Sequence, residues 1–125
     1  MVKVARWLIL AGSVVLLATA VLHGSGFRKV SLMIAKSGLS PLAADALKAL
    51  WLMFSIHLAV LSVVFVVASR TLAAKRLVLL CALIPVADTL LMFRFLGVFV
   101  GTISILSAAL LFLIGGALLP SGAEG

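Results

Sequence analysis

Four long apolar runs dominate this sequence. They cover residues 7–22, 49–69, 77–93 and 95–119. A helix needs about 20 mostly apolar residues to cross the roughly 30 Å hydrocarbon layer of a bilayer. Lipid cannot satisfy an unpaired backbone, and these runs are too continuous for the alternating strands of a membrane barrel. The sequence therefore predicts an all-α integral membrane four-helix bundle, formed as a single transmembrane domain over residues 1–125.

The composition supports a membrane protein. Hydrophobic residues make up 66% of the chain and charged residues 10%, whereas soluble proteins average about 45–50% apolar and about 25% charged residues. The net charge of +7 comes from ten lysines and arginines against three acids. Because the basic residues flank the apolar runs, we expect them to bind anionic lipid headgroups and not nucleic acid.

The first run has an alternative interpretation as a secretory signal. Lys3 and Arg6 precede it, and the small residues Ala18-Thr19-Ala20 lie near its end, which is the order of features in a signal peptide. We interpret it as a retained membrane span.

The segment between the first two runs predicts a short interfacial helix over residues 27–36. Its apolar residues recur at helical spacing and are Phe27, Val30, Met33 and Ile34. Its cations, Arg28, Lys29 and Lys36, suit a helix lying on the headgroup layer. Glycines and serines at 24–26 and 37–40 predict turns at both ends. Ser40-Pro41 then predicts the start of the second spanning helix, outside the hydrocarbon.

The basic residues leave the orientation in the membrane nearly balanced. With four spans, one side receives Lys3, Arg6, Arg70, Lys75 and Arg76. The other side receives Arg28, Lys29, Lys36, Lys48 and Arg94. A count of positive charges therefore gives no orientation. The compact connection over 69–76 resembles a cytoplasmic loop, so we expect both termini in the cytoplasm, in the plasma membrane of a bacterium.

Asp88 is the one acid inside an apolar run, and His57 is its expected partner. Asp88 lies six residues before Arg94, which should reach the interface, and His57 lies six residues after Trp51, an interface marker. Six residues of helix are about 9 Å. The two groups are therefore expected at similar depth on neighbouring antiparallel helices.

A carboxylate and an imidazole in contact can form a charge-assisted hydrogen bond or share a proton. Either removes the cost of burying Asp88, about 2.5–3.5 kcal/mol at a helix centre. The pair then has two interpretations: it fixes the helices against one another, or it is a functional protonation or binding site. Pro85 frees the carbonyl of Cys81, so both residues are candidates for a small polar pocket beside the pair.

Further residues are expected at the headgroup level. They are Trp7, His23, Lys48, Trp51 and Arg94. The Asp45-Lys48 spacing permits an ordinary surface ion pair. His23 and His57 lie at different depths, and no cluster of carboxylates, histidines and cysteines completes a metal shell, so we predict no haem, metal or other cofactor.

The last run carries a stripe of small residues that predicts close helix packing. The stripe contains Gly97, Gly101, Ser104, Ala108 and Gly115, and it begins as a GxxxG sequence. The first run has a comparable stripe: Ala5, Gly12, Thr19 and His23. Two arrangements fit. The stripes pack on each other within one bundle, or the last run packs against a second protomer or a larger partner.

Three functional classes follow from these features. The first, which we favour, is an interaction or accessory subunit of a membrane assembly, homo- or hetero-oligomeric. The second is a small-solute or proton-coupled transporter or channel that uses Asp88 and His57. The third is a lipid- or quinone-modifying enzyme, which ranks last because the sequence shows no nucleophile with a positioned base, phosphate loop or metal motif.

Overall fold

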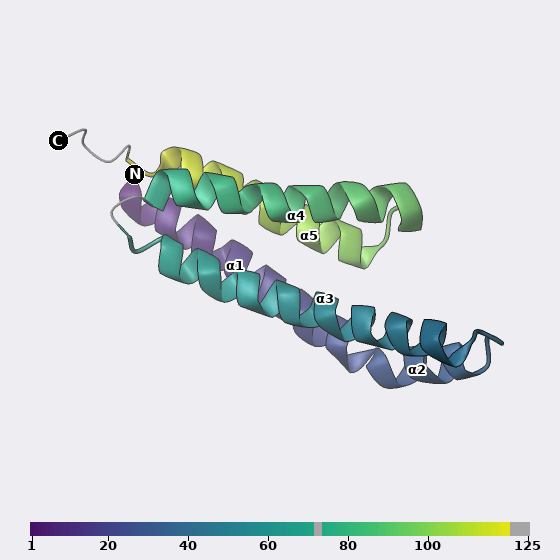
Figure 1. Cartoon of the computed structure of the whole chain (residues 1–125). Coiled ribbons are helices and arrows are strands. Elements are labelled where there is room, and N and C mark those ends of the chain that lie inside the picture. Colours follow the sequence, from purple (N-terminus) through teal and green to yellow (C-terminus); the bar gives the residue numbers. More distant parts are fainter. Residues whose placement is uncertain (72–73, 121–125) are drawn as a thin grey trace.

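The fold is entirely helical over the part of the chain that the structure, a computed structural model, describes: residues 1–71 and 74–120. Its helices are α1 (Val2–Ser25), α2 (Phe27–Ala35), α3 (Pro41–Ala68), α4 (Ala74–Leu96) and α5 (Val100–Leu118). Figure 1 shows them as long, roughly antiparallel rods. Four helical segments, with α1 and α2 taken together, are long and apolar enough to cross a membrane. The predicted all-α class is confirmed.

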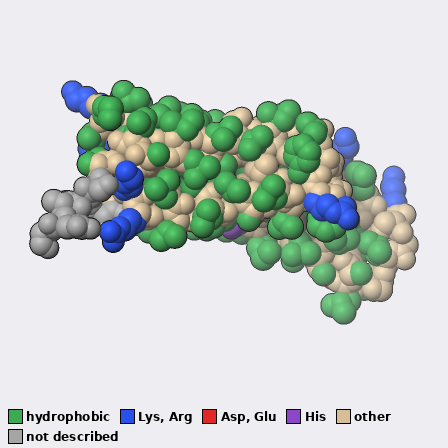
Figure 2. All heavy atoms as spheres, turned by 90° about the horizontal axis from the view of Figure 1, so that it is seen from above, with side chains coloured by type: hydrophobic (Ala, Val, Ile, Leu, Met, Phe, Trp, Pro, Cys, Tyr) green, Lys and Arg blue, Asp and Glu red, His purple; other side chains and the backbone are tan. Residues whose placement is uncertain are grey.

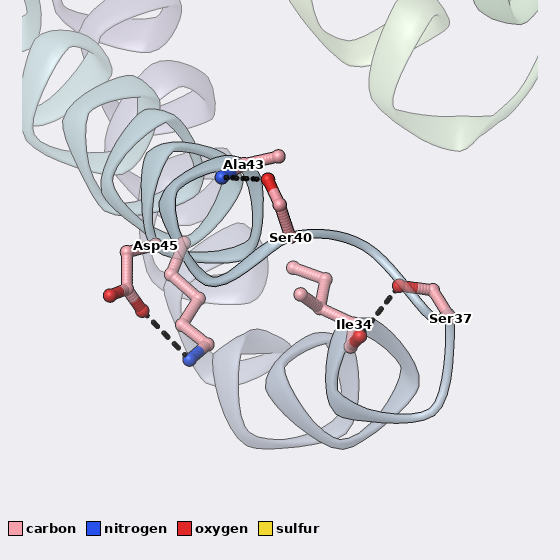
Figure 3. Close-up of polar contacts among 6 residues, drawn as sticks. Ile34, Ser37, Ser40, Ala43 and Asp45 are labelled. Atoms are coloured by element: carbon pink, nitrogen blue, oxygen red, sulfur yellow. Dashed lines mark hydrogen bonds and ion pairs between the residues drawn. The ribbon is translucent and has the colours of Figure 1, made fainter.

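The start of α3 agrees with the sequence. Ser40 is the N-cap and Pro41 occupies the first turn. The backbone amide of Ala43 donates to Oγ of Ser40 at 3.4 Å (Figure 3). A serine side chain in this position satisfies one of the amide groups that a helix start leaves unpaired, so the helix begins where the residues predict.

The junction between α1 and α2 contains the predicted turn, but the turn is nearly helical. Gly26 lies between the two helices, and its φ of −73° and ψ of −10° are close to helical values. Its amide donates to the carbonyl of His23 at 3.2 Å, and its carbonyl accepts from the amide of Val30 at 3.1 Å. The backbone hydrogen bonds thus pass through the glycine, and α2 prolongs α1 with little change of direction (Figure 1).

The last two helices meet at a different residue from the one predicted. The third run was expected to end at Phe93 and the fourth to begin at Phe95, but α4 continues to Leu96 and α5 begins at Val100. Gly97 has a φ of +75°, a conformation that glycine adopts at little cost and that ends helices. Gly97 therefore forms the turn and lies outside the helix that it was expected to help pack.

The helices are ordered α3, α1, α5, α4 across the molecule. α1 packs extensively on both α3 and α5, and α4 packs extensively on α5, whereas α3 and α4 touch little. In Figure 1 the α1–α3 pair and the α4–α5 pair lie close together at the end that holds both termini and diverge from each other towards the opposite end. The fold is therefore a partly open bundle with a seam between α3 and α4.

The centre of the core is a pair of stacked aromatic rings. Phe65 of α3 and Phe112 of α5 are fully buried, and their ring centroids lie 3.4 Å apart. Gly12 of α1 lies directly against the Phe112 ring, and Gly115 of α5 lies against Ile9 of α1. The absence of side chains at these glycines lets α1 and α5 approach closely. The first of the two packing arrangements, within one bundle, is the one observed.

The packed face of α5 is rotated from the predicted small-residue stripe. Two members of the stripe, Ala108 and Gly115, are buried in the packed face. Ser104 is only partly buried, and its hydroxyl donates a hydrogen bond to the carbonyl of Val100 at 2.8 Å. Gly101 lies near Phe99 and Met92, at the start of α5. The face centres instead on Ile105 and Phe112, both fully buried. Large side chains fill the space between the helices, and small ones flank them.

The surface is apolar between two charged ends. Figure 2 shows one face, on which lysine and arginine side chains gather at both ends and hydrophobic side chains cover the middle. At the α2 end, Lys48 Nζ bonds the Asp45 carboxylate at 3.1 Å in an exposed ion pair (Figure 3). Such pairs contribute about 0.2–1 kcal/mol at most to the stability of a fold. The charged ends therefore matter more for contacts with the surroundings than for stability.

Candidate functional site

The His57 imidazole of α3 meets the Asp88 carboxylate of α4. Nε2 of His57 lies 3.1 Å from Oδ2 of Asp88. The side chain of His57 is 38% exposed and that of Asp88 is 18% exposed, so the pair is partly buried and still accessible from outside the protein. The contact expected from the matching depths of the two residues is present, and it bridges the two helices that otherwise touch little.

An open groove runs between α3 and α4 next to this pair. Its volume is about 400 Å³, and its walls include Met53, His57, Val60 and Val64 of α3 and Cys81 and Ile84 of α4. Apart from His57, these side chains are apolar. The groove is therefore apolar except for His57, whose side chain bonds Asp88, a residue outside the groove wall.

The predicted polar pocket at Cys81 and Pro85 is not what the structure contains. Cys81 lines the groove, but Pro85 is fully buried and is absent from the groove wall. The carbonyl of Pro85 accepts a hydrogen bond from Thr89 Oγ1 at 2.7 Å. Pro85 thus faces the packed side of α4, and the polar side chain among the residues that line the groove is His57.

The sequence of α3 explains why His57 faces the groove. Met53, His57 and Val64 recur at helical spacing along one side of the helix. A polar stripe on the other side faces α1: Oγ of Ser62 donates to the buried carbonyl of Ser13 at 2.9 Å. These two stripes fix the rotation of α3 between α1 and α4.

His23 belongs to a second polar cluster, where α1 meets α3. Its Nδ1 lies 2.8 Å from Oγ of Ser55, and Nε1 of Trp51 donates to its backbone carbonyl at 2.9 Å. The His23 and Trp51 rings are stacked with centroids 3.9 Å apart. His23 and Trp51 were expected at the headgroup level as separate residues; the structure joins them in one contact that ties the end of α1 to α3.

Phe54 lies between the two histidines. Its ring is edge-on to His23 at 5.1 Å and stacked on His57 at 6.2 Å between centroids. A phenylalanine ring carries no exchangeable proton, so these contacts make an aromatic row and not a hydrogen-bonded path. Among the described residues no group of three or more His, Cys, Asp or Glu side chains is placed to hold a metal ion.

The remaining predicted interfacial residues lie towards the two ends of the molecule. Trp7 is 72% exposed near the start of α1. Arg94 lies in the last turn of α4, with its guanidinium 5.4 Å from the centre of the Phe95 ring. Lys48 bonds Asp45 on the early turns of α3. The structure does not bring any of these residues to the His57–Asp88 pair.

Comparisons of the chain with models of protein families, with curated proteins and with solved structures find no match.

Proposed function

We propose that this chain is an interaction or accessory subunit of a membrane assembly, inserted in a bacterial plasma membrane with both termini in the cytoplasm. One observation carries the proposal: a helical hairpin, formed by α2 and residues 41–50 of α3, projects beyond the ends of α4 and α5 and exposes apolar side chains (Figure 1). We call this hairpin the projecting tip.

The length of the tip follows from the His57–Asp88 contact. Trp51 and Arg94 each lie six residues from that contact, towards the same end, and are therefore at about the same level. The residues of α3 before Trp51 extend about 15 Å past this level. The headgroup layer on each side of a bilayer is only about 5–8 Å thick. The outer half of the tip therefore stands beyond the lipid.

The side chains of the tip match this position. Arg28 and Lys29, at the start of α2, lie within the headgroup layer, where anionic lipids favour cations. Further out, α2 has no buried residue. Leu32, Met33 and Leu42 are exposed, Leu42 to 83%. Large apolar side chains exposed to water on a short segment favour a surface that another protein covers, either a protein partner or a second copy of the chain.

Site-specific photo-crosslinking tests the proposal. A photoreactive phenylalanine analogue replaces Met33 on the tip or, as the matched control, Val63, an exposed residue of α3 deep within the span. At Met33 we expect a discrete protein adduct, with a second copy or with one other membrane protein. At Val63 we expect lipid adducts and no protein adduct. Lipid adducts alone at both positions would overturn the proposal.

The His57–Asp88 contact favours a second candidate, a small-solute or proton-coupled transporter or channel. Intramembrane carboxylates are enriched on transport pathways, and this one is partly exposed. Asp88→Asn separates the candidates. A variant that is less stable or loses its partner supports the subunit; a variant that is intact and assembled but has lost solute or proton flux in vesicles supports the transporter.

A further inference from the structure

We infer that the partner of the projecting tip is a different protein with an acidic surface, on which carboxylates flank an apolar patch, and that it binds the outer face of α2. This outer face consists of four exposed residues: Lys29, Leu32, Met33 and Lys36. Such a partner is a narrower form of the proposed subunit function and rests on it. The charges of the tip select it over a second copy of the chain.

Helical spacing places the four residues on one side of α2. Lys29, Met33 and Lys36 are separated by four and three residues, and Leu32 lies four residues before Lys36. The two lysines are about 10 Å apart along the helix axis, with the two apolar side chains between them. The outer face is therefore an apolar centre with a cation at each end, which is how a binding surface with an apolar core and a polar rim is arranged.

The other side of α2 is used within the chain. Phe27, Val30 and Ile34 are half-buried, and α2 packs on α3. In Figure 3 the Ile34 side chain points from α2 towards α3. A helix that binds a lipid surface turns its apolar side to the lipid. In α2 most of that side faces α3, and the Lys36 end stands beyond the headgroup layer, so lipid is a poor occupant for the outer face.

The tip has more cations than it neutralises. Arg28, Lys29 and Lys36 are exposed, and none of them forms an ion pair with another described residue. Asp45 is the acid of the tip, and it already bonds Lys48. Three cations therefore remain for a partner. Carboxylates opposite them give the complementary potential that favours a specific contact between two proteins.

A second copy lacks the acids that this face requires. Two copies inserted in the same direction meet tip to tip about a twofold axis, and a cationic face then meets the same cationic face. Like charges across an interface oppose binding. The other acids are elsewhere: Asp88 bonds His57 within the span, and Glu124, outside the described residues, follows α5, which ends far from the tip (Figure 1).

Charge reversal tests the partner. The photoreactive phenylalanine analogue is placed at Met33 of the full chain, and the yield of the protein adduct is measured in native membranes. Lys36→Glu should lower this yield about fivefold, and Lys36→Gln should lower it by a smaller factor. Arg94→Glu is the matched control, because it reverses an exposed cation at the same end of the molecule, on α4 and outside the tip. It should leave the yield unchanged.

Two further measurements identify the charge of the partner directly. Raising the ionic strength from about 0.1 M to about 1 M shortens the screening length from about 10 Å to about 3 Å. This should lower the adduct yield at least threefold with no further substitution in the chain. Mass spectrometry then identifies the partner segment that is joined to position 33. Replacing the carboxylates of that segment by lysine should abolish the adduct with Lys36 present and restore it with the Lys36→Glu variant.

The possible failures are distinguishable. An adduct whose yield is insensitive to Lys36→Glu and to salt, or rises with either, would overturn the acidic partner and leave the subunit function in place. An adduct with a second copy of the chain would do the same. Lipid adducts alone at position 33 would overturn the subunit function itself, and the acidic partner with it.

Discussion

The Phe112 ring lies so close to the backbone of Gly12 that a Cβ atom there would be 2.8 Å from the ring. Phe112 cannot easily move away, because it is fully buried and its ring stacks on Phe65. The packing of α1 on the Phe112 ring of α5 thus depends on a hydrogen atom in place of a side chain at Gly12, with the stacked rings filling the space between α1, α3 and α5.

Gly12→Ala should therefore destabilise the fold by about 1–3 kcal/mol, the usual cost of adding a methyl group to a filled core. Gly24→Ala is the matched control in the same helix, since the nearest atom to its added Cβ is Oγ of Ser55 at 3.6 Å, an ordinary contact. Thermal unfolding in detergent should show a clear loss for the first variant and little change for the second. Equal stability of the two variants would contradict the close packing.

The buried hydrogen bond from Ser62 to Ser13 should contribute measurably to stability. Ser62→Ala removes the donor and leaves the carbonyl of Ser13 with one partner fewer, which should cost about 0.6–1.7 kcal/mol in a membrane-like environment. Ser104→Ala is the control, because its hydroxyl bonds only its own helix on an exposed side. Denaturant unfolding in mixed micelles measures both. A control variant as unstable as Ser62→Ala would show that the interhelical bond adds nothing.

Counting along helices predicted well which residues of neighbouring helices lie at the same level, and it predicted the rotation of helices poorly. The fixed rise per residue placed His57 and Asp88 at one level from Trp51 and Arg94, and the two side chains are in contact. For α5, the only sequence signal was the spacing of small residues, since no charged or strongly polar side chain marks a face in residues 95–119. Which side of such a helix packs depends on the shapes of its neighbours, such as the Phe65 ring against Phe112.

The sequence also did not predict which side chains meet where two helices pack on each other. The stacking of Trp51 on His23 joins residues 28 positions apart, and periodicity within either helix does not indicate which side chains of the other it meets. Gly26 and Gly97 look alike as sequence signals. At Gly26 backbone hydrogen bonds lead from α1 into α2, whereas Gly97 takes a positive φ and turns the chain between α4 and α5, because tertiary contacts decide which of its accessible conformations a glycine adopts.

The His57–Asp88 pair should show strong energetic coupling. His57→Leu alone leaves a sheltered carboxylate without its partner and should cost about 1–3 kcal/mol, less than the 3–5 kcal/mol of a fully buried pair because both groups are partly exposed. The double replacement by leucine should restore most of that stability. A double-mutant cycle from unfolding in detergent measures the coupling, and additive effects of the two single changes would show that the contact contributes no interaction energy.

The proposed orientation predicts which end of the molecule faces outward. In a Cys81→Ser background, which removes the only cysteine of the chain, Ser37→Cys places a thiol on the exposed connection between α2 and α3, and Lys3→Cys places one near the N-terminus. If both termini are cytoplasmic, a membrane-impermeant maleimide added to intact cells should label the first variant and not the second. Lysed cells should show labelling of both, which establishes that each thiol is reactive. The reverse pattern in intact cells would place the projecting tip in the cytoplasm, and the partner of the tip would then have to be sought on that side of the membrane.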